Sequence, residues 1–103
     1  MLNVYEFTSY SKYLKALTQK GERPFTVSAL AQFAGVQRPY LSNVLAGRAH
    51  LNAEQGYRLG EKLRFDDKAQ TYLSLLIEYE RASEQKYKSF LFSKIKEQRE
   101  SAL

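Results

Sequence analysis

Apolar residues along this chain recur every three to four positions, with little strict alternation of apolar and polar residues. This spacing is typical of amphipathic helices, which gather apolar side chains on one face. Asn3, followed three residues later by Glu6 as in a capping box, predicts a short first turn. A longer helix over 9–19 should follow. Its buried face is expected to consist of Tyr10, Tyr13, Leu14 and Leu17.

Caps and breakers set the limits of the next two helices. Thr26 is a suitable N-cap for a second helix, and Gly35 ends that helix because glycine adopts the left-handed conformation at little cost. A third helix is expected over 38–46, where Pro39 is tolerated in the first turn and Gly47 marks the end. The turn between these two helices is therefore only a few residues long.

The rest of the chain continues the helical pattern. Asn52 with Gln55 forms a second capping-box pattern and opens a fourth helix. Further helices are expected over 67–81 and from a Ser83 cap toward Arg99. The sequence thus predicts an all-α, compact bundle of five to six helices in a single domain, 1–103, with C-terminal helices over 67–100 that pack on the rest.

Composition limits the class of protein without changing this fold. The chain has 103 residues and no cysteine, which excludes disulfides and thiolate metal sites and agrees with a cytoplasmic location. Its N-terminus is too polar for a signal peptide, and no apolar run approaches the roughly 20 residues needed to cross a bilayer. We therefore expect a soluble protein.

Charge is unevenly distributed along the chain. Of the net charge of +5, residues 12–48 hold six basic residues against one acidic residue, whereas residues 51–83 hold five against six. The six are Lys12, Lys15, Lys20, Arg23, Arg38 and Arg48. A polyanion is a plausible partner for the first half. For Lys12 and Lys15, solvation of an exposed helix face is an equal explanation.

Two short helices joined by a short turn containing glycine form a helix-turn-helix, whose second helix can lie in the DNA major groove. Periodicity alone does not separate this motif from an ordinary helical hairpin. The finer pattern favours the motif, because Ala31 is small where the helices cross. The residues expected to fix the crossing angle are Leu30, Val36, Leu41 and Val44.

The stretch "LAQFAGVQRPYLSNVLAGR" resembles the phage-repressor-like (XRE-type) helix-turn-helix family, specifically over residues 26–48 and more loosely over 9–63. The resemblance rests on Leu-Ala, Gly-Val, a polar pair, an apolar position and a terminal Gly followed by a basic residue. It implies a lambda-repressor-like bundle of about five helices. The N-terminal "NVYEFTSYSKYLK" resembles a group of bacterial regulators in which such a domain precedes a long C-terminal domain. By that resemblance the chain is a short member or an N-terminal part.

Helical geometry selects the residues that can face DNA. With Leu41, Val44 and Leu45 turned inward, the opposite edge of the third helix faces outward. The expected base-reading residues are Arg38, Pro39, Ser42 and Asn43. Pro39 offers only apolar contact, where the family often carries a hydrogen-bonding residue. The expected DNA-backbone residues are Thr26, Ser28, Gln37, Tyr40 and Arg48, with additional charge from Lys20 and Arg23.

No residue pattern indicates catalysis, a metal or a cofactor. His50 is the only histidine, so a role in a loop or cap is expected. Asp66 and Asp67 resemble paired carboxylates, but they fit a helix N-terminus better. "GYRLGEK" lacks the strand and spacing of a phosphate-binding loop. We therefore expect that this protein is not an enzyme.

The fifth and sixth helices carry more apolar residues than one buried face needs. Two DNA-binding heads on a symmetric dimer would match two half-sites, which predicts a homodimer through these helices. The interface residues expected are Tyr72, Leu75, Tyr79 and Phe92. An equal alternative is that the sixth helix packs on the fifth within one chain.

The sequence therefore predicts a sequence-specific regulator of transcription that binds double-stranded DNA by inserting helix 38–46 in the major groove. The alternative is a non-catalytic helical protein-interaction module, such as an adaptor or an antitoxin-like subunit, that uses the aromatic surface of the last two helices. Salt separates the two hypotheses, because DNA binding releases counterions whereas an apolar interface responds little.

Overall fold

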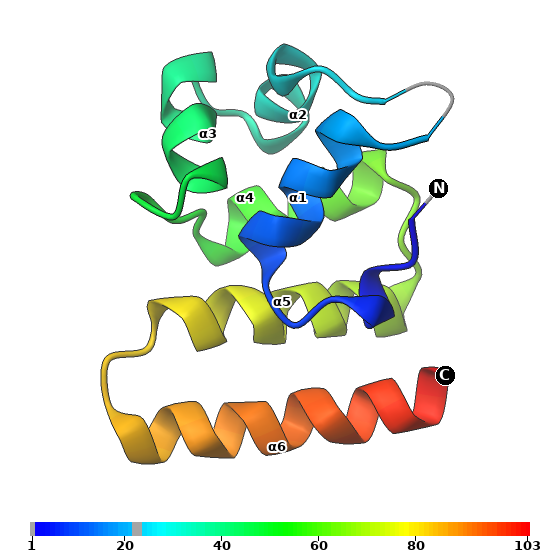
Figure 1. Ribbon diagram of the computed structural model, residues 1–103, viewed down its shortest axis with the longest axis vertical. Coiled ribbons are helices and arrows are strands. Elements are labelled where there is room, and N and C mark those ends of the chain that lie inside the picture. Colours follow the sequence, from blue (N-terminus) through cyan, green and yellow to red (C-terminus); the bar gives the residue numbers. More distant parts are fainter. Residues whose placement is uncertain (1, 22–23) are drawn as a thin grey trace.

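The computed structural model describes residues 2–21 and 24–103, and within them every regular element is helical (Figure 1). The expected Arg23 contribution lies outside the described residues. A one-turn 3-10 helix η1 precedes six α-helices, so the all-α bundle of five to six helices is confirmed. The bounds are η1 Val4–Glu6, α1 Tyr10–Gln19, α2 Val27–Ala34, α3 Arg38–Leu45, α4 Ala53–Lys62, α5 Asp67–Arg81 and α6 Gln85–Ala102.

The helices begin where short polar side chains can satisfy free backbone N–H groups. Thr26 Oγ1 accepts a hydrogen bond from the N–H of Ala29 at 3.0 Å, and Asp66 Oδ1 accepts one from the N–H of Ala69 at 2.9 Å. Ser9 caps α1 in the same manner. At α4 both halves of the predicted capping box are present. These local bonds explain why the expected starts of α1, α2, α4 and α5 are confirmed.

Two expected caps differ from the structure. Ser83 does not cap the last helix: α6 begins two residues later, with Glu84 at the N-cap position and no side-chain cap bond. The extended backbone of Ala82, with φ −66° and ψ 137°, and of Glu84 lets the chain turn back along α5. At the first turn, Asn3 Oδ1 accepts from the N–H of Tyr5 and not from that of Glu6. The Glu6 N–H instead donates to the Asn3 carbonyl oxygen at 3.1 Å, which closes a 3-10 turn.

The core draws buried side chains from all six α-helices, and it includes the face of α1 that the sequence predicts. Tyr10, Tyr13 and Leu14 have no exposed surface, and Leu17 is 3% exposed. Burial raises the pKa of both Tyr10 and Tyr13 to about 12. These two phenols therefore stay neutral at ordinary pH and serve the packing of α1.

The last two helices form an antiparallel pair, with α6 lying along α5 at the end of the molecule remote from α2 (Figure 1). Leu91 and Ile95 are buried between them. The rings of Tyr79 and Phe92 pack at a centroid distance of 5.6 Å. The sequence left open whether the sixth helix packs on the fifth within one chain, and the structure shows that it does.

Tyr72 is not a surface residue, contrary to the expectation that it lies at a dimer interface. Its side chain has no exposed surface, and its hydroxyl donates to the backbone carbonyl oxygen of Phe7. The chain's own N-terminal segment therefore covers it. Leu75, Tyr79 and Phe92 are half-buried against the core of the same chain.

Two glycines let α4 and α5 approach closely. A Cβ atom on Gly56 would lie 2.4 Å from Cδ1 of Ile77, and one on Gly60 would lie 2.2 Å from Oε1 of Gln70. From the sequence these glycines only weaken the helix. In the structure they are the contact surface that positions α4. None of the described helices is at once long enough and apolar enough to cross a membrane.

Candidate nucleic-acid interface

A three-residue turn, Gly35 to Gln37, joins α2 to α3. Gly35 has φ +77° and ψ 35°, the left-handed conformation expected for it, and its N–H donates to the carbonyl oxygen of Ala31 at 2.9 Å. The N–H of Val36 donates to the same oxygen at 3.0 Å. Gln37 then adopts an extended conformation that starts α3, with Pro39 in the first turn. The turn geometry fixes the direction in which α3 leaves α2.

A buried wedge fixes the angle between the two helices. Leu30, Leu41 and Val44 have no exposed surface, and Ala31 at the crossing is 3% exposed. Val36 is half-buried at the edge of this group. Because α3 also packs on α1, the inner face of α3 is fully used by the core. The other face of α3 is therefore held in a defined orientation.

Arg58 of α4 holds the end of α2, a role that the sequence analysis missed. Its Nε and Nη2 donate to the carbonyl oxygen of Ala34 at 3.3 and 3.1 Å. The guanidinium passes so close to Gly35 that a Cβ atom there would lie 3.1 Å from Nη2. A cation at a helix C-terminus is favourable because free carbonyl groups carry partial negative charge. The pair is separated by 24 positions in sequence, so no local pattern indicates it.

The outer edge of α3 brings the four expected base-reading residues together on the surface. Arg38, Pro39, Ser42 and Asn43 are all exposed. No carboxylate pairs with Arg38, since within residues 2–21 and 24–103 the one ion pair joins Lys94 to Glu97 on α6. This edge consequently offers a positive charge that has no ion-pair partner among the described residues.

One contact on this edge links two predicted roles. Arg48 Nε donates to Asn43 Oδ1 at 3.2 Å, and the N–H of Arg48 donates to the carbonyl oxygen of Asn43 at 2.8 Å. An asparagine that pairs with adenine uses its Oδ1 and its amide N–H together. Because Oδ1 has two lone pairs, the bond from Arg48 leaves one of them for adenine. The Nη groups of Arg48 take no part in this contact and suit a phosphate.

Tyr40 and His50 tie α3 to the loop that follows it. The Tyr40 hydroxyl donates to the carbonyl oxygen of His50 at 2.6 Å, although 41% of the Tyr40 side chain is exposed. His50 Nδ1 lies 3.0 Å from the hydroxyl of Tyr10 in α1. His50 thus has the structural loop role that its sequence context predicts. Its imidazole connects the loop to the core.

The remaining backbone-contact candidates lie at the start of α2 and at the turn. Thr26, Ser28 and Gln37 are exposed, as is Lys20 at the end of α1. Thr26 uses its hydroxyl oxygen as the α2 cap, so its hydroxyl proton remains a donor. In the described part of the chain, no group of three or more His, Cys, Asp or Glu residues is arranged to hold a metal ion.

No family model matches the chain, and no curated protein or solved structure matches it either.

Proposed function

We propose that this protein is a sequence-specific double-stranded DNA-binding regulator of transcription that inserts α3 into the major groove. The carrying observation is the exposed edge of α3, which has an arginine and an asparagine free of carboxylates while its opposite face is locked in the core. Arg38 at the start of α3 suits guanine or a phosphate, and Asn43 suits adenine. Ser42 adds a hydroxyl, and Pro39 offers apolar contact to a thymine methyl group.

Contacts to the DNA backbone would set affinity and register. The proposed residues flank α3 on both sides: Thr26, Ser28, Gln37, Tyr40 and Arg48. Hydroxyl and guanidinium donors at such positions suit phosphate oxygens, and they carry no sequence information. Tyr40 supports α3 through its bond to the His50 carbonyl and would present mainly its ring to the backbone.

We further propose membership of the phage-repressor-like helix-turn-helix family and action in the bacterial cytoplasm. The support is the coincidence of the "LAQFAGVQRPYLSNVLAGR" pattern with two short helices, a left-handed Gly35 and a buried wedge. Each of these features serves the same end. Together they present one helix edge at a fixed angle.

A homodimer is part of the proposal, because a single DNA-binding module of this size seldom binds tightly alone. The surface proposed for it lies over α5 and α6, where Leu75, Tyr79 and Phe92 are only half-buried. This surface lies at the end of the molecule away from α2 (Figure 1). Pairing there would leave both copies of α3 accessible.

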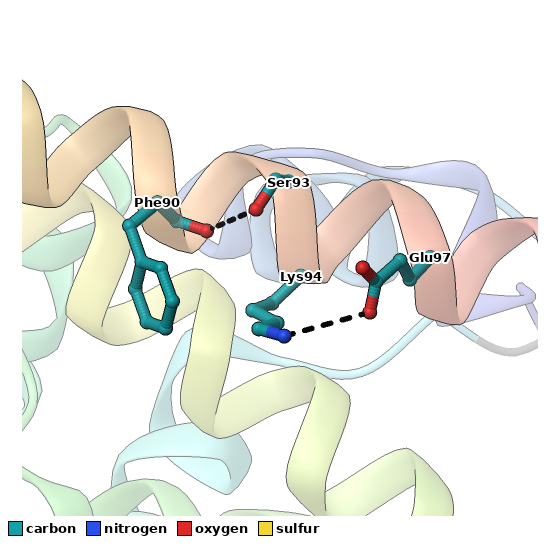
Figure 2. A network of polar contacts seen from close by, with 4 residues as sticks. All are labelled: Phe90, Ser93, Lys94 and Glu97. Carbon is teal, nitrogen blue, oxygen red and sulfur yellow. Dashed lines mark hydrogen bonds and ion pairs between the residues drawn. The ribbon is translucent and has the colours of Figure 1, made fainter.

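A protein-interaction module is the second candidate, and exposed rings on α6 favour it. Tyr87 and Phe90 are 45% and 54% exposed, and they stack at a centroid distance of 6.4 Å. Figure 2 shows Phe90 beside Lys94, whose Nζ lies 5.4 Å from the ring centroid and pairs with Glu97. Exposed aromatic rings are common anchors of protein interfaces.

Selection of bound sequences from a pool of random duplexes tests the proposal. A DNA-binding regulator should enrich one sequence, and a dimer should enrich two half-sites related by symmetry. Affinity for the enriched duplex should fall steeply as salt rises. The Asn43→Ala variant serves as matched control, since it should lose preference at one base pair while keeping affinity for random duplex. Absence of enrichment would favour the interaction module.

A further inference from the structure

A polar hollow lies beside α3, and of its lining residues only Tyr40 has a role in the DNA contacts proposed above. It has a volume of about 520 Å³ and is lined by Tyr40, His50, Asn52, Gln55 and Arg81. These residues come from α3, from the loop after it, from the start of α4 and from the end of α5. In Figure 1 the end of α5 and this loop lie on the same side of the molecule. The lining residues include no carboxylate.

The side-chain oxygens of Asn52 and Gln55 already accept hydrogen bonds. Asn52 Oδ1 accepts from the N–H of Gln55 at 2.8 Å, and Gln55 Oε1 accepts from the N–H of Asn52 at 2.9 Å. Both side-chain NH₂ groups therefore remain, and neither has an acceptor among the described residues. Four N–H donors at these two amides are thus available to a ligand.

His50 also presents a donor. The Tyr10 oxygen already accepts from the N–H of Leu51 at 3.0 Å, which favours donation of the Tyr10 hydroxyl proton to His50 Nδ1, 3.0 Å away. In that tautomer the ring proton is on Nε2. This ring nitrogen is the one directed away from Tyr10.

Arg81 supplies the charge of the hollow. Its Nη1 donates to the carbonyl oxygen of Leu51 at 2.9 Å, which holds the guanidinium against the loop. Its other N–H groups have no acceptor in the part of the chain that the structure describes. The neighbouring Glu80 makes no ion pair with it, and the Glu80 carboxylate accepts bonds from Ser9 and Ser11 at the start of α1.

We propose that this hollow binds a backbone phosphodiester of the DNA, next to the major groove into which α3 inserts. Arg81 would supply the positive charge, and His50, Asn52 and Gln55 would donate hydrogen bonds. A site made of donors with one cation fits a tetrahedral oxyanion. Tyr40 belongs both to the hollow and to α3, so an anion held there would lie beside the helix that enters the groove. This inference rests on the proposed function.

Two substitutions separate charge from structure. Arg81→Gln removes the charge but keeps an amide donor for Leu51. Gln55→Glu keeps the capping box, because glutamate serves that position as well as glutamine does, but it places a carboxylate at the hollow. Matched controls carry the same charge changes elsewhere: Lys68→Gln, about 20 Å away along α5 at 1.5 Å per residue, and Gln98→Glu on α6.

Duplex affinity is measured by fluorescence anisotropy over a range of salt concentrations. For Arg81→Gln we expect a loss of roughly fivefold to tenfold at 0.1 M salt on specific and random duplex alike, and a salt slope smaller by about 0.9. For Gln55→Glu we expect a loss of about tenfold or more with no loss of thermal stability. The two control variants should bind like the wild-type protein.

The outcomes distinguish this inference from the function on which it rests. If the wild-type protein binds no duplex, the proposed function fails. If it binds duplex and both hollow variants keep the wild-type affinity and slope, only the phosphate site is overturned. NMR spectra of the free protein with inorganic phosphate give a further test. If phosphate shifts the His50 ring resonances while duplex binding is insensitive to both substitutions, the hollow holds a free anion and the proposed DNA phosphate site is overturned.

Discussion

The close crossing of α4 and α5 can be tested by adding one carbon atom and removing another. Gly56→Ala places a Cβ atom 2.4 Å from Cδ1 of Ile77, while the next nearest atom, Cγ1, is at 3.9 Å. Relief of the glycine penalty in a helix stabilises by about 1 kcal/mol, and overpacking costs about 1 to 3 kcal/mol. The single variant should therefore lose about 0 to 2 kcal/mol of unfolding free energy.

The substitution Ile77→Val removes the clashing Cδ1 atom and nothing else. Alone it should cost about 0.5 to 1.5 kcal/mol. In the double variant the new Cβ atom fills the space that Cδ1 leaves, so stability should return close to that of the wild-type protein. The expected coupling free energy is about 0.5 to 3.5 kcal/mol in favour of the pair.

Urea and thermal unfolding followed by circular dichroism measure this coupling, where 1 kcal/mol corresponds to a shift in Tm of roughly 4 to 8 °C. The matched control combines Ile77→Val with Gly60→Ala, whose Cβ atom meets Gln70 instead of Ile77. That pair should be additive. If Gly56→Ala stabilises the protein and its effect adds to that of Ile77→Val, the close approach of the two helices at this point is refuted.

Three further predictions concern DNA contacts, caps and buried tyrosines. Arg38→Ala should reduce the binding free energy for the selected duplex by about 1 to 3 kcal/mol and relax one base preference, whereas Arg48→Ala should weaken binding to all duplexes alike. Equal losses on specific and random DNA for both variants would contradict the base-reading role of Arg38. Asp66→Ala should lower the unfolding free energy by about 1 kcal/mol because the Ala69 N–H loses its cap, while Ser83→Ala should leave it unchanged. Urea unfolding measures both, and an equal loss would contradict the observed start of α6. Spectrophotometric titration should find Tyr13 ionising only near pH 12. Because burial raises its pKa in the folded state, its contribution to stability is full below the unfolded pKa near 10 and is lost between pH 10 and 12; early ionisation of every tyrosine would contradict that burial.

Helix positions were predictable from the sequence because the forces that start and end a helix are local. A Thr26 hydroxyl reaches an N–H three residues away, and Gly35 ends α2 by its own backbone freedom. The prediction that Ser83 caps the last helix was wrong, because the start of that helix is not set by local bonds. The start of α6 follows from the path that the chain takes to return along α5, and that path is set by packing between the two helices.

The candidate DNA edge of α3 followed from helical period, because burying Leu41 and Val44 forces the residues between them outward. The residues that hold this edge in place could not be predicted from helical period. Arg58 reaches Ala34 across 24 positions, and the Tyr10 bond to His50 spans 40. No spacing within a helix encodes such partners, since they meet only when α1, α2 and α4 are packed together.

The sequence by itself determined the helices, most of their caps, the bend at Gly35 and which edge of α3 is polar, because each depends on residues within one or two turns of each other. Tertiary structure alone decided that Tyr72 is covered by the N-terminal segment, that Gly56 is a contact surface for α5, and that Arg81 stands in a hollow beside α3. An amphipathic pattern states how much apolar surface must be buried. Which partner buries it depends on the shapes that meet when the whole chain packs.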